Sequence, residues 1–118
     1  MSPIDLAAKL KRDCATANQR VAKLRARGNV SPTLDCELTD IEAWCAYGNY
    51  FAAKLRAGVA LGTARAKGDA EQQRAAVAEL EQALVHWKHL AELTGRFNQM
   101  PVPSNWRQPF SWALLTRD

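Results

Sequence analysis

The chain has 118 residues, of which 47% are apolar and 24% charged, and its formal net charge is +4 at pH 7. This length fits one domain, and the apolar share is large enough to build a core, which argues against wholesale disorder. No apolar run approaches the roughly 18 residues of a membrane span, and the N-terminal segment MSPIDLAAKLKRD lacks an apolar signal core. We therefore expect no membrane span and no export signal in the chain as given.

The first predicted helix covers residues 3–27. Ser2 can cap it, Pro3 suits its first position, and Gly28 is a natural stop. Apolar residues recur at steps of three and four, which predicts that one side packs on another helix. This column consists of Ala7, Leu10, Cys14, Ala17, Val21 and Leu24.

This first helix also carries most of the positive charge. Its seven bases and two acids give 7 − 2 = +5, more than the net charge of the whole chain. A solvated face is the simplest interpretation, and contact with an anionic partner is the alternative. The aromatic residues lie elsewhere, so no stacking platform for nucleic-acid bases accompanies these charges and specific nucleic-acid binding is not expected. The candidate partner-binding residues on this helix are Lys9, Arg12, Arg20, Lys23 and Arg27.

The second predicted helix covers residues 32–67, with Ser31 as its cap. A new helix could begin at Thr39, but one continuous helix is favoured because Leu34 and Leu38 extend the same apolar column. That column continues through Ile41, Cys45, Gly48, Ala52, Leu55, Val59 and Gly62. A second column, Trp44, Phe51 and Gly58, widens the predicted packing face.

The third predicted helix covers residues 70–95, after Gly68 ends its predecessor and Asp69 caps the new start. Its expected packing column is Val77, Leu80, Leu84, Trp87, Ala91 and Thr94, flanked by Ala83 and Leu90, with Gly95 as its end. Residues 96–118 are rich in proline and aromatic side chains, which predicts a strap along a groove, and Trp112 to Leu115 could start a short fourth helix. The fold expected is all-α: an antiparallel three-helix bundle in a single domain, 1–118, which could be excised from a longer protein.

Two pairings follow from the short turns. If both helices rise equally, the turn at Gly68 places Trp87 level with residue 49, and Gly48 is the expected contact because it has no side chain. The turn before the second helix makes Cys14 face Cys45. Cys36 lies on the opposite side of that helix, and all three thiols are expected to be reduced.

Residues with catalytic or metal-binding chemistry do not form a convincing set. His86, His89 and Glu92 share a helix face, but they lack metal-type spacing. Glu37 and Asp40 fit a helix dipole better than a catalytic acid pair. Cys14 and Cys45 fit core positions better than nucleophiles. We therefore expect no catalytic residue, metal ion or cofactor.

The string DIEAWCAYGNYFAAKLRAGVAL, followed by AVAELEQALVHWKHLAEL and FSWALL, resembles a helical region near the C-terminus of large bacterial proteins of glycoside-hydrolase type. The resemblance covers about residues 35–115 and rests on Asp40, Gly48, Tyr50, Lys54, Gly58 and Trp87. It implies a non-catalytic accessory domain attached to a carbohydrate-active enzyme, whose catalytic centre lies in another domain. Trp106 and Trp112 are further candidates for partner contact. The alternative is a free-standing helical protein that binds a protein or nucleic acid through the first helix, and a small enzyme has the least support.

Overall fold

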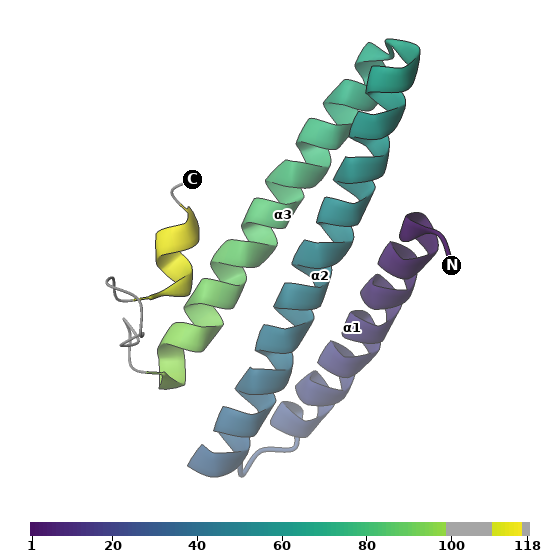
Figure 1. Ribbon diagram of the computed structural model, residues 1–118. Coiled ribbons are helices and arrows are strands. Elements are labelled where there is room, and N and C mark those ends of the chain that lie inside the picture. Colours follow the sequence, from purple (N-terminus) through teal and green to yellow (C-terminus); the bar gives the residue numbers. More distant parts are fainter. Residues whose placement is uncertain (99–109, 117–118) are drawn as a thin grey trace.

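The computed structural model describes residues 1–98 and 110–116 and shows an all-α three-helix bundle (Figure 1). Helix α1 covers Pro3–Ala26, α2 covers Pro32–Lys67, and α3 covers Ala70–Phe97. A short 3-10 helix, η1, covers Trp112–Thr116 and packs on α3. It lies where the sequence suggested the start of a short fourth helix. The predicted strap, with Trp106, falls largely on residues 99–109 and lies outside the described residues.

The helix starts follow from local capping. The Ser2 side chain accepts a hydrogen bond from the Asp5 amide, and the Asp5 carboxylate accepts from the Ser2 amide, which forms a capping box. Ser31 caps α2 at the Leu34 amide, and Asp69 caps α3. Helix α2 runs through Thr39 without a break, as predicted.

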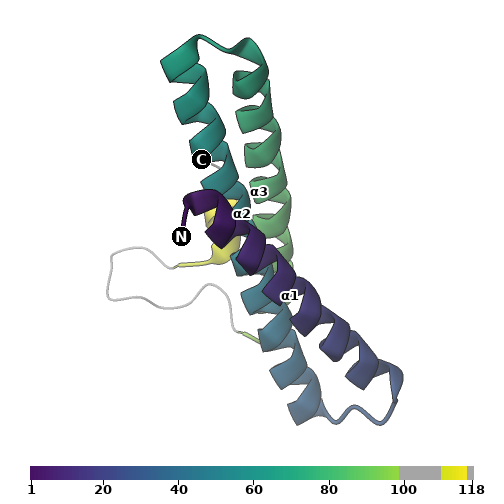
Figure 2. The same cartoon turned by 90° about the vertical axis from the view of Figure 1, so that its right-hand side faces the viewer.

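Helix α2 is the central element of the bundle. Helices α1 and α3 each pack on α2, but no Cα atom of α1 lies within 8 Å of one in α3. Figure 2 shows α1 crossing α2 obliquely, whereas α2 and α3 run side by side. The two outer helices therefore depend on two separate interfaces with α2.

The interface between α2 and α3 is built mainly from alanine. Ala53 and Ala57 of α2 and Ala83 of α3 are each at most 4% exposed. Small side chains allow two helix backbones to approach closely, so this interface leaves little room for large residues. The buried residues on these two sides also include Ala46, Ala60, Ala64, Ala76, Leu90 and Leu93.

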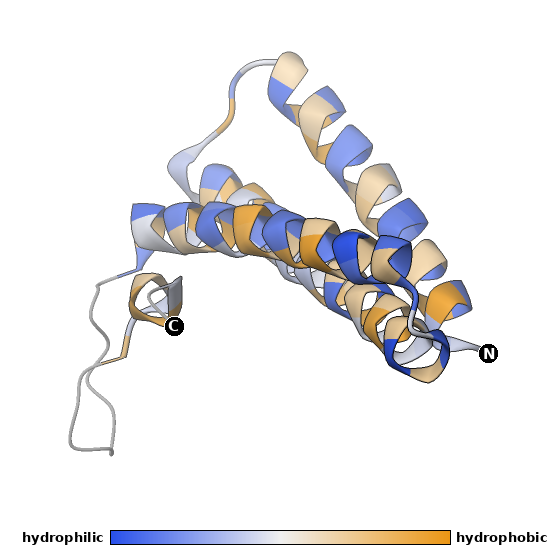
Figure 3. Cartoon of the chain, turned by 90° about the horizontal axis from the view of Figure 1, so that it is seen from above, coloured by the Kyte–Doolittle hydropathy of each residue, from blue (hydrophilic) through white to orange (hydrophobic). Residues whose placement is uncertain are grey.

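The predicted packing column of the third helix is therefore wrong in part. Val77, Leu80 and Leu84 are 53%, 48% and 42% exposed, while the buried row runs one position earlier through Ala76 and Ala83. The predicted second column of α2 is also not in the core, since Trp44 is 73% and Phe51 43% exposed. Figure 3 shows hydrophobic segments recurring along the helices, and large hydrophobic side chains occur at exposed as well as buried positions. Hydrophobicity alone does not select the side that meets another helix.

The predicted contact between Gly48 and Trp87 is also wrong. A Cβ atom at position 48 would lie 2.7 Å from Sγ of Cys14, and nothing else is within 4 Å. Gly48 therefore faces α1. Trp87 lies close to the predicted level of residue 49 on α2, but it contacts Tyr50, and the two ring centroids are 4.7 Å apart.

Helix α3 also passes the predicted stop at Gly95 and ends at Phe97. Gly95 keeps a helical conformation, and the Asn98 side chain donates to the Thr94 carbonyl at 2.8 Å, which closes the last turn. Arg96 lies 3.8 Å from the carboxylate of Asp35 on α2, and this contact supports the extension of α3 beyond Gly95.

The predicted pairing of Cys14 with Cys45 is confirmed. Both residues are buried, at 8% and 5% exposure, and each thiol affects the pKa of the other, as neighbouring side chains do. All three cysteines are free, and Cys36 is half-buried.

Candidate functional site

An apolar groove of about 410 Å³ opens between the first half of α2, the end of α3 and η1. Trp44, Tyr47 and Trp112 supply its aromatic walls, and Leu90 and Ala43 add aliphatic surface. Asp40 and Thr94 are its polar neighbours. We call this feature the aromatic groove.

The groove belongs to a continuous series of aromatic contacts. Ring centroids lie 6.2 Å apart between Trp44 and Tyr47 and 6.1 Å apart between Tyr47 and Tyr50. The series continues through Trp87 to Trp112, whose centroids are 5.3 Å apart in an edge-on arrangement. Such offset geometries are favourable for aromatic pairs.

Trp112 is held in place by Trp87. The indole Nε1–H of Trp87 donates to the Trp112 carbonyl at 3.0 Å, which anchors η1 on α3. Trp87 and Trp112 also pack against the buried cluster of Ala46, Leu90 and Leu93. The predicted partner residue Trp112 thus lines the groove but is half-buried. Trp44, predicted to lie on the packing face, is the most exposed aromatic residue of the groove.

Three aromatic residues of α2 share one exposed side. At about 100° per residue, Trp44, Tyr47 and Phe51 fall within an arc of roughly 60°, well away from the alanine row that faces α3. Their exposed fractions are 73%, 40% and 43%. Gly58 and Gly62 continue this side, and a Cβ atom there would meet nothing within 4 Å. We call these five residues the apolar face of α2.

The predicted basic surface of α1 is exposed as a unit. Lys9, Arg12, Arg20, Lys23 and Arg27 are all exposed, and at about 100° per residue they span an arc of roughly 80°, nearly opposite the buried side of α1. Lys9 pairs with Asp13 one turn away. Among the described residues, the other four bases have no ion pair.

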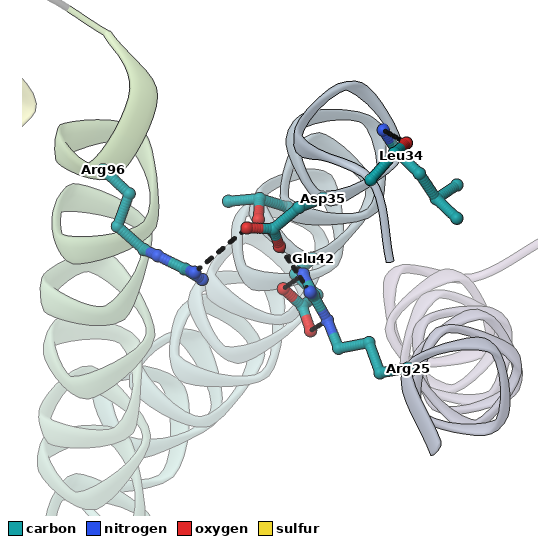
Figure 4. A network of polar contacts seen from close by, with 7 residues as sticks. Arg25, Leu34, Asp35, Glu42 and Arg96 are labelled. Atoms are coloured by element: carbon teal, nitrogen blue, oxygen red, sulfur yellow. Dashed lines mark hydrogen bonds and ion pairs between the residues drawn. The ribbon is translucent and has the colours of Figure 1, made fainter. Parts of the chain in front are cut away.

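Arg25 behaves differently from these bases, because it joins the helices internally (Figure 4). Its guanidinium donates to both carboxylate oxygens of Glu42, at 3.3 and 3.0 Å, and also to Asp35. The hydrogen bonds that Arg25 donates to Asp35 and Glu42 raise its pKa. Since Arg96 of α3 also approaches Asp35, this cluster links all three helices and is structural.

The acid and histidine candidates do not converge. Asp40 borders the aromatic groove, whereas Glu37 does not line it. His89 lies 3.8 Å from Glu92, but His86 sits deeper, where burial and the nearby charge of Arg56 lower its pKa. Within residues 1–98 and 110–116, no group of three or more His, Cys, Asp or Glu side chains is placed to hold a metal ion.

The two buried thiols are poorly suited to nucleophilic catalysis. Burial raises the pKa of Cys14, and burial together with Cys14 raises that of Cys45 to about 11. The thiolate, which is the reactive form, is therefore scarce at neutral pH.

A scan against protein-family models, a search of curated proteins and a search of solved structures found no match to this chain. In the part of the chain that the structure describes, no helix has the length and apolar character needed to cross a membrane.

Proposed function

We propose that this chain is a non-catalytic helical interaction domain that packs against another domain of a larger bacterial glycan-degrading enzyme. The observation that supports this proposal is the inversion of side-chain size between core and surface. Alanine fills the α2–α3 interface, while Trp44, Tyr47 and Phe51 are exposed on α2. Large exposed apolar patches on a folded domain are typical of surfaces that another protein covers.

The composition of this surface fits a protein partner. Tryptophan and tyrosine are enriched at the energetic centres of protein interfaces. Gly58 and Gly62 leave room for close approach of another backbone along the same side of α2. The assignment to a glycan-degrading enzyme rests on the sequence resemblance across about residues 35–115.

Hydroxyl-radical footprinting tests the proposal by comparing the isolated chain with the longer polypeptide that its gene encodes. We expect oxidation of Trp44 and Phe51 to fall several-fold in the longer polypeptide, because another domain covers them. Val85, which is 57% exposed on α3, is the matched control and keeps its labelling. Equal labelling of Trp44 in both samples, or a gene without a further domain, would refute the proposal.

A second candidate function is binding of an anionic protein or nucleic acid through α1. It is favoured by the common exposure of Lys9, Arg12, Arg20, Lys23 and Arg27. Non-specific phosphate binding weakens steeply with salt, so affinity for an arbitrary duplex DNA should vanish near physiological salt. Tight binding that persists there and disappears in Arg12→Ala, Arg20→Ala and Lys23→Ala would favour this second function.

A further inference from the structure

Two of the three cysteines meet across the interface between α1 and α2. Cys14 of α1 and Cys45 of α2 are both buried, and Sγ of Cys14 lies against Gly48, about one helical turn after Cys45 on α2. Both are free in the structure. Both side chains therefore lie in one interface, at the same level of two different helices.

The Cys14 side chain packs directly against the backbone of α2 at this level. Sγ of Cys14 occupies the space where a side chain of residue 48 would begin, 2.7 Å from the position of a Cβ atom. A Cβ atom at this position would force the Cys14 side chain or α1 to shift. A disulfide requires Cα atoms about 4.4–6.8 Å apart, which is closer than most helix pairs come, and this glycine-lined contact favours such an approach.

Helix α1 is also the element that can expose these thiols. Its buried residues are Ala7, Cys14 and Val21, and none of its Cα atoms lies within 8 Å of one in α3. The turn that joins it to α2 contains Gly28 and Asn29 in the left-handed conformation, with φ of 73° and 56°. Elements with few buried contacts open locally before the whole fold unfolds.

We propose that Cys14 and Cys45 form a disulfide in an oxidising environment and that this bond locks α1 onto α2. The oxidant is a small-molecule disulfide such as oxidised glutathione. One cysteine thiolate attacks it, forms a mixed disulfide and releases one small thiol. The second cysteine thiolate then attacks the protein sulfur, forms the Cys14–Cys45 bond and releases the second small thiol. The protein loses two electrons and two protons, and the small disulfide is reduced to two thiols.

Cys36 provides an internal comparison. It precedes Cys45 by nine residues in one uninterrupted helix, which places it about 180° around α2. A bridge between Cys36 and Cys45 is therefore excluded while α2 is intact. Cys36 is only half-buried, so it is the thiol that a reagent can reach in the closed structure.

The test uses the Cys36→Ser variant, equilibrated in a glutathione redox buffer without denaturant. The readouts are intact mass, peptide mapping and hydrogen exchange of α1. We expect a monomer that has lost two hydrogens, one peptide pair joined through Cys14 and Cys45, and slower amide exchange in α1. A disulfide that closes the loop from Cys14 to Cys45 should shift the equilibrium for local opening of α1 on the order of 10²-fold, from the loss of chain entropy in the opened state.

The matched controls are Cys14→Ser and Cys45→Ser in the same background, in which oxidised buffer should leave α1 exchange unchanged. If Cys36→Ser does not fold, the wild-type chain with Cys36 alkylated under native conditions replaces it. A glutathione adduct that never resolves, a bridge only between two chains, or a bridge that leaves α1 exchange unchanged would each overturn the proposal.

Discussion

Substitution of Gly48 by alanine tests the contact between α1 and α2 directly. In an open helix position, glycine to alanine stabilises by about 1 kcal/mol. At position 48 the new Cβ atom would lie 2.7 Å from Sγ of Cys14, well inside van der Waals contact. Cys14 has a single side-chain torsion with few wells allowed in a helix, and it is buried, so its sulfur has little room to move aside. Overpacking of this kind costs about 1–3 kcal/mol.

The two terms oppose each other, and their sum predicts that Gly48→Ala lowers the free energy of unfolding by up to about 2 kcal/mol. Urea denaturation followed by circular dichroism at 222 nm, the standard helix signal, measures this change. Gly58→Ala and Gly62→Ala are matched controls on the same helix, since neither Cβ atom would meet anything within 4 Å. Each should stabilise by up to about 1 kcal/mol, or raise Tm by roughly 4 °C.

A double-mutant cycle separates the clash from any other effect of the substitution. In a Cys14→Ala background the obstructing sulfur is absent, so Gly48→Ala should become stabilising, with a coupling of about 1–3 kcal/mol between the two sites. If Gly48→Ala stabilises the wild-type chain as much as Gly58→Ala does, α1 does not approach α2 at this level. The proposed Cys14–Cys45 disulfide would then lose its geometric basis.

Three further predictions use matched variants and equilibrium unfolding. Leu90→Ala should lower the free energy of unfolding by about 2–5 kcal/mol, because Leu90 is 4% exposed. Leu84→Ala should lower it by less than about 1 kcal/mol, because Leu84 is 42% exposed, and equal losses would contradict the assignment of the core. Arg25→Ala should lower the free energy of unfolding by about 1–3 kcal/mol, because it leaves the carboxylates of Asp35 and Glu42 unpaired. This range allows for the screening of a partly exposed ion pair by solvent. Arg20 is exposed, so Arg20→Ala should change the same quantity by less than about 0.5 kcal/mol. The pKa of His86 in the folded chain is lowered from 6.5, so the unfolded chain binds a proton at a higher pH than the folded chain does. The free energy of unfolding should therefore fall as the pH drops from 7 through 6.5. His86→Gln should flatten this dependence relative to His89→Gln, and an unchanged profile would show that His86 is not desolvated.

The candidate surfaces could be predicted only in part. The exposure of the basic residues of α1 was predicted correctly, because charged residues opposite a buried column lie on the solvent side whatever the column packs against. The aromatic groove and the apolar face of α2 were not predicted, because Trp44 and Phe51 follow the apolar period of α2 and that period alone places them in the core. The signal available in the sequence was the alanine row at 46, 53, 57, 60 and 64, which has the same period but a weaker hydrophobicity.

By itself, the sequence determined the helices, their caps, their antiparallel order and the level at which residues of neighbouring helices meet. These features depend on interactions within a few residues, such as Ser2 with Asp5, and on short turns that fix the register, so Cys14 was placed opposite Cys45. Only the tertiary structure decided which side of α2 meets α3. That choice depends on how closely two backbones can approach, and the approach favours alanine over tryptophan and phenylalanine even though the larger side chains are more hydrophobic.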